Sequence, residues 1–399
     1  MDKTKNHPKP VWLFLAVMIA GIAARLLVAT LGYNYDFDSW QIIAKLVEHG
    51  DNVYASTGRY NFAPGWFLIL HALDVLSGQN SEVFRYMVSG FLGLGDAGIF
   101  YILWRRFGML AGCWFFLNPI SIIISGYQNN FDNLAILLGL MAALLMGEDF
   151  DRPVGRRKFL GLFVLGLSLM VKHVFFAFPF WLAVKQKGLS QKLAVILIPV
   201  LMFAFSFVPC WSGGSQGILQ NVFQYRAVDT AFFYHMFVPP LVQFMFGSQA
   251  VWFLLMTLFA FIFRKKNTVE FLLLYTCVLV AAAPASVNEY LAIPGAFVAT
   301  HLNLLTILFT AAGTAHLLVA VNGPLGSTSF TVKGFGAAYL PGNGLHLTGL
   351  FGLSFIDIAI YLLCLALIWV TWRQIIVAWL KQLLEWCVSE VKNQLGLNK

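Results

Sequence analysis

The chain has 399 residues, of which 59% are hydrophobic and only 11% are charged. Soluble domains carry about a quarter of charged residues, so this composition excludes an ordinary water-soluble domain. The formal net charge is +8, but the basic residues stand in short clusters between apolar blocks. Such clusters are typical of cytoplasmic loops and of contacts with anionic lipid headgroups, not of a nucleic-acid surface. We therefore expect an all-α polytopic membrane protein that binds membrane lipids and no nucleic acid.

The apolar blocks predict about ten to thirteen transmembrane helices. The first block, residues 11–31, is long enough to span a bilayer and follows a basic segment, residues 1–10, that we expect in the cytoplasm. No small-residue cleavage site follows the block, so it is expected to stay as an uncleaved anchor. The five cysteines are scattered and predict neither a disulfide framework nor a metal site.

Two carboxylates, Asp36 and Asp38, come directly after the first span and are framed by aromatic residues. Their position places them at the membrane–water boundary, on the side opposite the basic N-terminus. Residues 39–49 then show apolar side chains at helical spacing. This pattern predicts a helix on the outer membrane surface, with Ser39 as its N-cap.

Three later blocks have lengths that do not suit a simple span. Residues 65–77 are too few and predict a re-entrant or partial helix, whereas residues 291–321 are enough for two spans. Residues 159–184 are long for one helix and short for two, with Lys172 and His173 in the middle. Irregular backbone at membrane depth is tolerated where it lines a cavity. These blocks therefore predict an internal cavity.

The chain divides by composition into a membrane region and a C-terminal part. The expected parts are a catalytic region at 11–320 with outer loops at 32–64, 125–132 and 209–231, a flexible outer loop and last helix at 321–372, and a cytoplasmic amphipathic tail at 373–399. Residues 323–349 are rich in Gly, Ser, Thr and Pro, which favours a loop. Residues 374–392 mix apolar and basic side chains, which favours a helix on the inner leaflet.

Three short motifs on the expected outer face resemble those of the GT-C class of polyprenyl-phosphate-sugar glycosyltransferases. Asp36-Phe37-Asp38 is similar to the acidic pair in the first outer loop of that class. Asn61-Phe62-Ala63-Pro64 resembles an aromatic-Pro-Pro element, with Ala63 at the first proline. Residues 126–132, which follow an Asn-Pro, resemble a Gly-His-x-Gly-Gln-Phe-Asp motif, with Asn130 for the glutamine. The class includes dolichol-linked glucosyl- and mannosyltransferases.

The resemblance implies a GT-C-like fold and a membrane hexosyltransferase. Such an enzyme takes its sugar from polyprenyl phosphate, either dolichyl or undecaprenyl, and gives it to a hydroxyl of a glycan, lipid or protein acceptor. It works on the periplasmic face of a bacterial inner membrane or on the lumenal face of the endoplasmic reticulum. No cofactor is certain, although a divalent cation (Mg or Mn) is used by some members.

The chemistry explains the residue types. The lipid phosphate is a competent leaving group, so the enzyme must deprotonate the acceptor hydroxyl and stabilise charge on the departing phosphate. Direct displacement with one base inverts the anomeric centre. By the resemblance, Asp36 is the expected base, and Asp38 is expected to orient the acceptor or to hold a divalent cation.

Further residues complete the expected substrate site. Cationic side chains can stabilise the phosphate through charge-assisted hydrogen bonds, and the candidates are Lys172, His173, Arg226 and Arg59. The other substrate-binding candidates are Tyr60, Asn130 and Asp132.

Several of these residues also have ordinary structural explanations. Asn130 and Asp132 could cap the helix that follows them, and Lys172 could extend to the membrane interface. Arg25 is expected to reach the outer interface in the same way. Asp96 is expected to be a buried structural acid.

One further acid, Glu289, begins a predicted helix. An acid at this position is stabilised by the helix dipole, and we expect that ordinary role for it.

Two other classes of protein remain open. A lipid-linked sugar transporter or flippase would also have many helices and broken segments. Transporters often contain internal repeats and place ionisable groups at mid-membrane, whereas this chain has no detectable repeat and carries its acids after the first span. A non-catalytic subunit would be consistent with Ala63 and Asn130 but not with the intact acidic pair.

Overall fold

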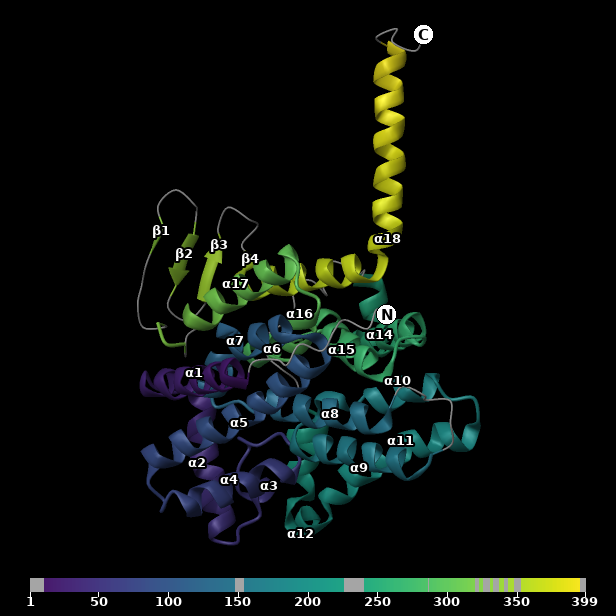
Figure 1. Ribbon diagram of the computed structural model, residues 1–399. Helices are drawn as coiled ribbons and strands as arrows, with labels where there is room; N and C mark the ends of the chain where they lie inside the picture. Colours follow the sequence, from purple (N-terminus) through teal and green to yellow (C-terminus); the bar gives the residue numbers. More distant parts are fainter. Residues whose placement is uncertain are drawn as a thin grey trace.

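The computed structural model is almost entirely helical over the residues that it describes (Figure 1). These are residues 11–147, 154–225, 240–285, 287–319, 323–325, 331–332, 337–340, 344–347 and 353–394. The first helices are α1 (Val11–Thr30), α2 (Tyr35–Glu48), α3 (Val53–Ser56), α4 (Pro64–Leu76), α5 (Ser81–Phe107), α6 (Met109–Phe116), α7 (Pro119–Gly126) and α8 (Asp132–Met146). The next are α9 (Arg156–Val171), the 3-10 turn η1 (His173–Phe175), α10 (Phe178–Val184), α11 (Leu189–Ser206), α12 (Val208–Gly217) and the π-helical turn η2 (Ile218–Phe223). The last are α14 (Pro240–Phe263), α15 (Thr268–Ala281), the 3-10 turn η3 (Asn288–Leu291), α16 (Gly295–Thr300), α17 (Leu304–Val319) and α18 (Phe355–Gln394).

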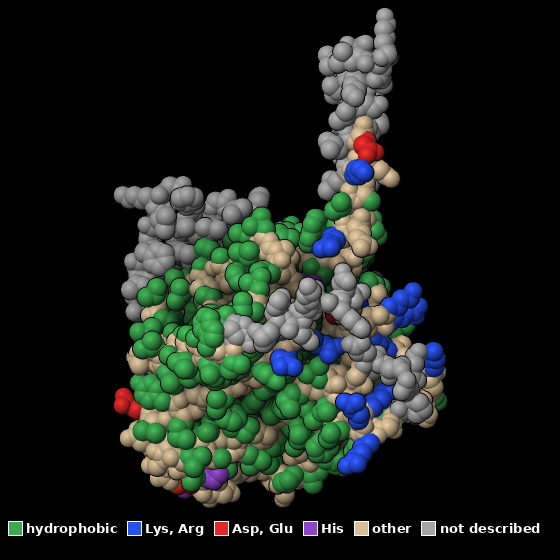
Figure 2. Space-filling model, in the orientation of Figure 1, with side chains coloured by type: hydrophobic (Ala, Val, Ile, Leu, Met, Phe, Trp, Pro, Cys, Tyr) green, Lys and Arg blue, Asp and Glu red, His purple; other side chains and the backbone are tan. Residues whose placement is uncertain are grey.

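The long helices form a layer in which neighbours pack in the order α1, α5, α8, α9 and α11. The shorter helices α2, α3, α4 and α12 gather at the lower end of this layer, and the C-terminal part of α18 extends away from the body at the upper end (Figure 1). Hydrophobic side chains cover most of the visible surface, and Lys and Arg gather on one side of the body (Figure 2).

The exposed surface of α1 is apolar, which requires a lipid environment. Trp12 and Leu27 are 70% and 66% exposed, and the buried residues of the helix are Gly21, Arg25 and Ala29, spaced four apart. A continuous apolar surface along a whole helix is unfavourable in water. Together with the long apolar helices, this surface indicates a membrane protein.

Within the described residues, four helices are long and apolar enough to cross a membrane, namely α1, α5, α11 and residues 355–378 of α18. The number rises to six if each of two bent pairs, α6 with α7 and α9 with α10, counts as one span. This is fewer than the ten to thirteen expected from sequence. Part of the difference arises because the apolar helices α4, α8, α15 and α17 have only 13–16 residues, which is short for a span at 1.5 Å per residue.

The irregular blocks behave largely as their lengths predict. Most of the block at 65–77 belongs to one short helix, α4, of 13 residues, and Ser77 is its C-cap. The block at 159–184 breaks between α9 and η1, where the chain turns by 119°. The expectation of two spans at 291–321 is wrong, since α16 has only six residues. A new helix begins soon after it because the Asn303 side chain caps α17 by accepting from the backbone N–H groups of Leu305 and Thr306.

The helix predicted over residues 39–49 is present, but it begins earlier than expected. The N-cap of α2 is Asn34, whose side-chain oxygen accepts from the backbone N–H of Asp36 at 3.1 Å. Ser39 is not the cap, because its hydroxyl lies inside the helix and donates to the carbonyl of Tyr35. Asp36 and Asp38 therefore occupy the first turn of α2, where the helix dipole favours negative charge.

The C-terminal region contains the described strands of the chain. They are β1 (Thr331–Val332), β2 (Ala337–Leu340), β3 (Gly344–Leu347) and β4 (Leu353–Ser354), paired antiparallel in that order. The other residues of the predicted loop at 323–349, apart from 323–325, lie outside the described residues. The helix predicted at 374–392 is the C-terminal half of the continuous helix α18 (Figure 1).

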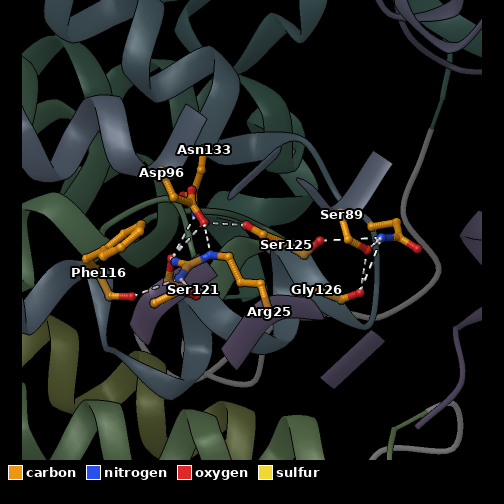
Figure 3. Close-up of polar contacts among 10 residues, drawn as sticks. Arg25, Ser89, Asp96, Phe116, Ser121, Ser125, Gly126 and Asn133 are labelled. Atoms are coloured by element: carbon orange, nitrogen blue, oxygen red, sulfur yellow. Dashed lines mark hydrogen bonds and ion pairs between the residues drawn. The ribbon is translucent and has the colours of Figure 1, made fainter. Parts of the chain in front are cut away.

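A buried ion pair joins α1 to α5. Arg25 and Asp96 are fully buried, and the Nε of Arg25 lies 2.7 Å from the Oδ2 of Asp96. Arg25 also donates to the carbonyls of Gly21 and Phe116 and to the hydroxyl of Ser121. Figure 3 shows these side chains converging. Arg25 therefore does not extend to the interface as expected, whereas Asp96 is the buried acid that the sequence predicts.

The same polar network reaches the loop between α7 and α8. Ser125 donates to Asp96 at 2.7 Å (Figure 3). The amide of Asn129 donates to the hydroxyl of Ser89 at 2.6 Å. Asn129 has a positive φ of 53°, a conformation that Asn tolerates better than most residues. A Cβ on Gly126 would lie 2.6 Å from the carbonyl oxygen of Arg25, so glycine permits this close packing.

We expect the single substitutions Arg25→Met and Asp96→Leu each to destabilise the protein by about 3–5 kcal/mol, because each leaves a buried charge without its partner. The double variant should recover much of the loss. Thermal unfolding of the full chain in detergent measures both effects. Lys381→Gln, which removes an exposed ion pair with Glu385, is the control and should cost less than about 1 kcal/mol. Single variants as stable as that control would contradict the assigned role.

A second close approach fixes α4 against α9. A Cβ on Gly65 would lie 2.5 Å from the carbonyl oxygen of Met170 and 3.2 Å from the backbone nitrogen of Val171. Gly65→Ala should therefore force the two helices apart and cost about 1–3 kcal/mol. Gly58→Ala is the matched control, since a Cβ there meets nothing within 4 Å. Thermal unfolding of both variants checks the difference, and equal melting temperatures would contradict it.

Candidate functional site

Three segments that are far apart in sequence converge at one end of the helical layer. They are the first turn of α2, the loop before α8 and the break after α9. The loop is tied to α2 because the indole N–H of Trp40 donates to the carbonyl of Asn129 at 3.1 Å. A hydrogen bond from Asn130 to Asp36 and an ion pair between Lys172 and Asp132 join the remaining parts.

Asp36 is half-buried and is held through one of its two oxygens. Its Oδ2 accepts from the side-chain amides of Asn34 at 2.9 Å and of Asn130 at 3.1 Å. Burial raises the pKa of the Asp36 carboxyl, whereas the Asn34 hydrogen bond, the Lys172 charge and the Asn130 hydrogen bond oppose the rise. No hydrogen bond to Oδ1 is made by the described residues, so this oxygen can accept a proton from another molecule.

Lys172 is buried beside this carboxylate and is paired with Asp132. Its Nζ lies 2.7 Å from the Oδ2 of Asp132, and the two side chains are 7% and 0% exposed. The same Nζ lies 5.0 Å and 4.9 Å from the ring centroids of Phe62 and Phe131. Lys172 is therefore not directed toward a membrane interface. It follows the last turn of α9 in an extended conformation, so the helix break itself delivers the ammonium group to the site.

The capping explanation for Asn130 and Asp132 is wrong. The N-cap position of α8 is Phe131, which makes no side-chain capping bond. Asp132 is the first residue of the helix and pairs with Lys172, and Asn130 donates to Asp36. Both side chains therefore serve the polar site. The Oδ1 of Asp132 is buried and has no hydrogen-bond partner among the described residues, which leaves an acceptor facing the interior.

Aromatic rings form the wall of the site. Trp66 stacks on Phe131 with ring centroids 4.2 Å apart. Trp40 meets both rings edge-on, and Phe62 lies 4.9 Å from Phe131. These rings exclude water from one side of the charged groups, which strengthens the interactions of those groups with one another.

Two of the predicted phosphate ligands lie near these groups, His173 beside the aromatic wall and Arg59 beside Tyr35. The ring of His173 lies 6.1 Å from that of Phe62 and 6.5 Å from that of Phe203, and its Nδ1 is buried without a partner among the described residues. The guanidinium of Arg59 lies 4.0 Å from the ring centroid of Tyr35, and its Nε likewise has no partner there. The Arg59 charge also acts on the carboxyl of Asp36. Arg59 therefore has an N–H group, and His173 a ring nitrogen, that no described residue pairs.

Three other predicted residues are placed differently. Tyr60 is fully buried, and its hydroxyl donates to the carbonyl of Ala63 and accepts from the N–H of Phe67. It therefore supports the turn before α4 and does not face a substrate. Asp38 is half-buried and makes no hydrogen bond among the described residues. Two helical steps turn its side chain by about 200° from that of Asp36, so the two carboxylates face different directions. Arg226 lies outside the described residues.

Glu289 is a candidate that the sequence interpretation did not include in the site. It lies in η3, and burial raises the pKa of its carboxyl to about 7. The Lys172 charge lowers this pKa, and the Asp132 and Asp36 charges raise it. Glu289 thus belongs to the same electrostatic cluster and is not only a helix-end acid. A sequence signal existed, since Glu289 is the one acid in a long apolar stretch, residues 271–322.

The cluster contains carboxylates from three segments, but they do not form a recognisable metal site. Within the described part of the chain, no group of three or more His, Cys, Asp or Glu side chains is arranged to hold a metal ion. The predicted use of a divalent cation stays a prediction.

The raised pKa of Glu289 predicts a change of stability with pH. A carboxyl with a raised pKa resists ionisation in the folded state, so stability falls as pH rises from about 4.5 to about 7. Glu289→Gln should reduce this fall, whereas Glu82→Gln, at an exposed acid, should not. Melting temperatures at several pH values between 4.5 and 7.5 measure the slopes. The same slope in wild type and Glu289→Gln would contradict the assignment.

Comparison of the chain with models of known protein families, with curated proteins and with solved structures found no match. These comparisons assign the chain to no family, so its function is inferred from the residues of the site and from the sequence motifs.

Proposed function

We propose that this protein is a membrane glycosyltransferase of the GT-C type. It moves a hexose from a polyprenyl phosphate, dolichyl or undecaprenyl, to a hydroxyl of a glycan, lipid or protein acceptor. The reaction takes place on the extracytoplasmic face and inverts the anomeric centre. The membrane is a bacterial inner membrane or that of the endoplasmic reticulum.

The arrangement around Asp36 carries this proposal. Its Oδ2 is held by Asn34 and Asn130, its Oδ1 accepts no hydrogen bond from the described residues, and the charges of Lys172 and Arg59 act on it. A carboxylate fixed in this way and partly removed from water is suited to general-base catalysis. The cationic groups nearby are suited to a phosphate leaving group.

The proposed reaction uses these groups in one step. The acceptor hydroxyl donates its proton to Oδ1 of Asp36 while its oxygen attacks the anomeric carbon. The bond from that carbon to the phosphate oxygen breaks on the opposite face, and the phosphate leaves as an anion. Arg59 and His173 donate hydrogen bonds to this anion. Asp132 keeps Lys172 in place, so the ammonium adds positive charge without moving.

The distribution of charge on the molecular surface supports the proposed orientation. Lys and Arg gather on one side of the body (Figure 2), as expected for the cytoplasmic side under the positive-inside rule. The basic loops containing Arg105 and Arg264 belong to the sequence clusters expected there. In this orientation α2 and the loop before α8 are extracytoplasmic. Asp38 remains available to orient the acceptor or to hold a divalent cation.

The proposal is tested by sugar transfer from labelled polyprenyl-phosphate hexoses in membranes that contain the full chain. We expect Asp36→Asn to reduce transfer by about 10²–10⁴-fold, because it removes the general base. Asp51→Asn is the matched control, since Asp51 lies in an exposed turn after α2. That control should transfer sugar at the wild-type rate.

Two results would contradict the proposal in different ways. Equal transfer by wild type and Asp36→Asn would remove Asp36 as the base and leave Asp132 and Glu289 as the acids to substitute next. Movement of labelled lipid between leaflets without transfer to any acceptor would instead assign the protein to the flippases.

A further inference from the structure

A groove with an apolar surface lies between α1 and α5. It is shallow and open along its length, with a volume of about 470 Å³. It is lined by Ala23, Leu26, Leu27, Thr30 and Tyr86. The hydroxyl of Thr30 donates to the carbonyl of Leu27 at 2.7 Å, so this residue offers its methyl group to the groove. The groove therefore suits an alkyl chain and not a polar ligand.

A cationic side chain stands beside one end of the groove. Arg85 precedes the lining residue Tyr86 in α5, and its Nη2 donates to the hydroxyl of Tyr86 at 3.4 Å. Its guanidinium lies 5.5 Å from the ring centroid of Tyr33 and 5.2 Å from that of Tyr86. Contact with aromatic rings uses the faces of the guanidinium. Apart from the Nη2–H that donates to Tyr86, the N–H groups in its plane then remain available to an anion.

Arg85 has no anionic partner within the described residues. No carboxylate lies within ion-pair distance there, and its Nε is buried without a hydrogen-bond partner. A guanidinium that is partly removed from water is stabilised when an anion accepts its hydrogen bonds. The Arg85 guanidinium therefore lacks an anionic partner within the described residues. A phosphate matches the geometry of its N–H groups.

Tyr33 and Arg85 are expected at the depth of the lipid headgroups. Tyr33 follows the end of α1, and Arg85 lies in the second turn of α5, so both are expected at the membrane interface. From there the groove runs back along α1 from Thr30 to Ala23, about 10 Å at 1.5 Å per residue. A phosphate at Arg85 would place its alkyl chain in the groove.

We propose that the groove between α1 and α5 is a binding site for an anionic phospholipid of the bilayer, with the phosphate on Arg85 and one alkyl chain along α1. Tyr33 links the site to the start of α2, because its ring lies 5.1 Å from that of Phe37, the residue after Asp36. The bound lipid would hold α1 and the first turn of α2 together. This role does not depend on the proposed transferase activity.

The test uses the full chain in nanodiscs that contain phosphatidylglycerol with a photoactivatable group in its alkyl chain. Crosslinked peptides are mapped by mass spectrometry. We expect label on residues 23–30, and about a tenfold loss of this label in Arg85→Gln, since a charge-assisted hydrogen bond is removed. Leu27→Trp should also reduce the label by filling the groove. Arg157→Gln, at an exposed arginine, removes the same charge elsewhere and should not change it.

Arg85→Lys keeps the charge but not the forked geometry and should give an intermediate loss, which guards against misfolding of the Gln variant. Undiminished label in both Arg85 variants would overturn the proposal. Equal labelling of residues 23–30 by a zwitterionic phosphatidylcholine probe would overturn it as well, because the groove would then not select an anionic lipid. Stronger displacement by undecaprenyl phosphate than by unlabelled phosphatidylglycerol would overturn the assigned occupant.

Discussion

The ion pair between Arg25 and Asp96 is the constraint on which the rest of the structure depends. Removing two charges from water is costly, and their attraction offsets that cost only if nearly all their hydrogen bonds are made. Arg25 meets this condition by donating to Asp96, to Ser121 and to two backbone carbonyls, and Ser125 adds a donor to the carboxylate. These groups come from α1, α5, α6 and α7, so the contacts fix how four helices pack, although the Oδ1 of Asp96 is buried without a hydrogen-bond partner among the described residues.

The loop before α8 connects this buried network to the candidate site. Asn129 is held in its positive-φ conformation by Ser89 and accepts a bond from Trp40 through its carbonyl. The neighbouring Asn130 and Asp132 then point to different partners, one to Asp36 and the other to Lys172. The polar groups of the site are thus positioned largely by a buried network that begins at the ion pair.

A broken helix supplies the cationic side of the site. Lys172 follows the end of α9, where the chain turns by 119°, and the close approach of Gly65 to Met170 holds that end against α4. The break allows the buried Lys172 to form an ion pair with Asp132. It also places His173 beside the aromatic wall, where its Nδ1 has no hydrogen-bond partner among the described residues.

The sequence by itself determined the class of the protein and the segments in which the site is found. A bilayer requires long apolar blocks, and polar residues beside such blocks are costly, so Asp36, Asn130 and Lys172 stand out in the sequence alone. Tertiary structure decided the partners, because contact between residues distant in sequence leaves no local pattern. It paired Arg25 with Asp96, 71 residues away, and placed Glu289 near Lys172. The local start of α2 at the Asn34 cap separates Asp36 from Asp38, since acids two positions apart on a helix face different directions.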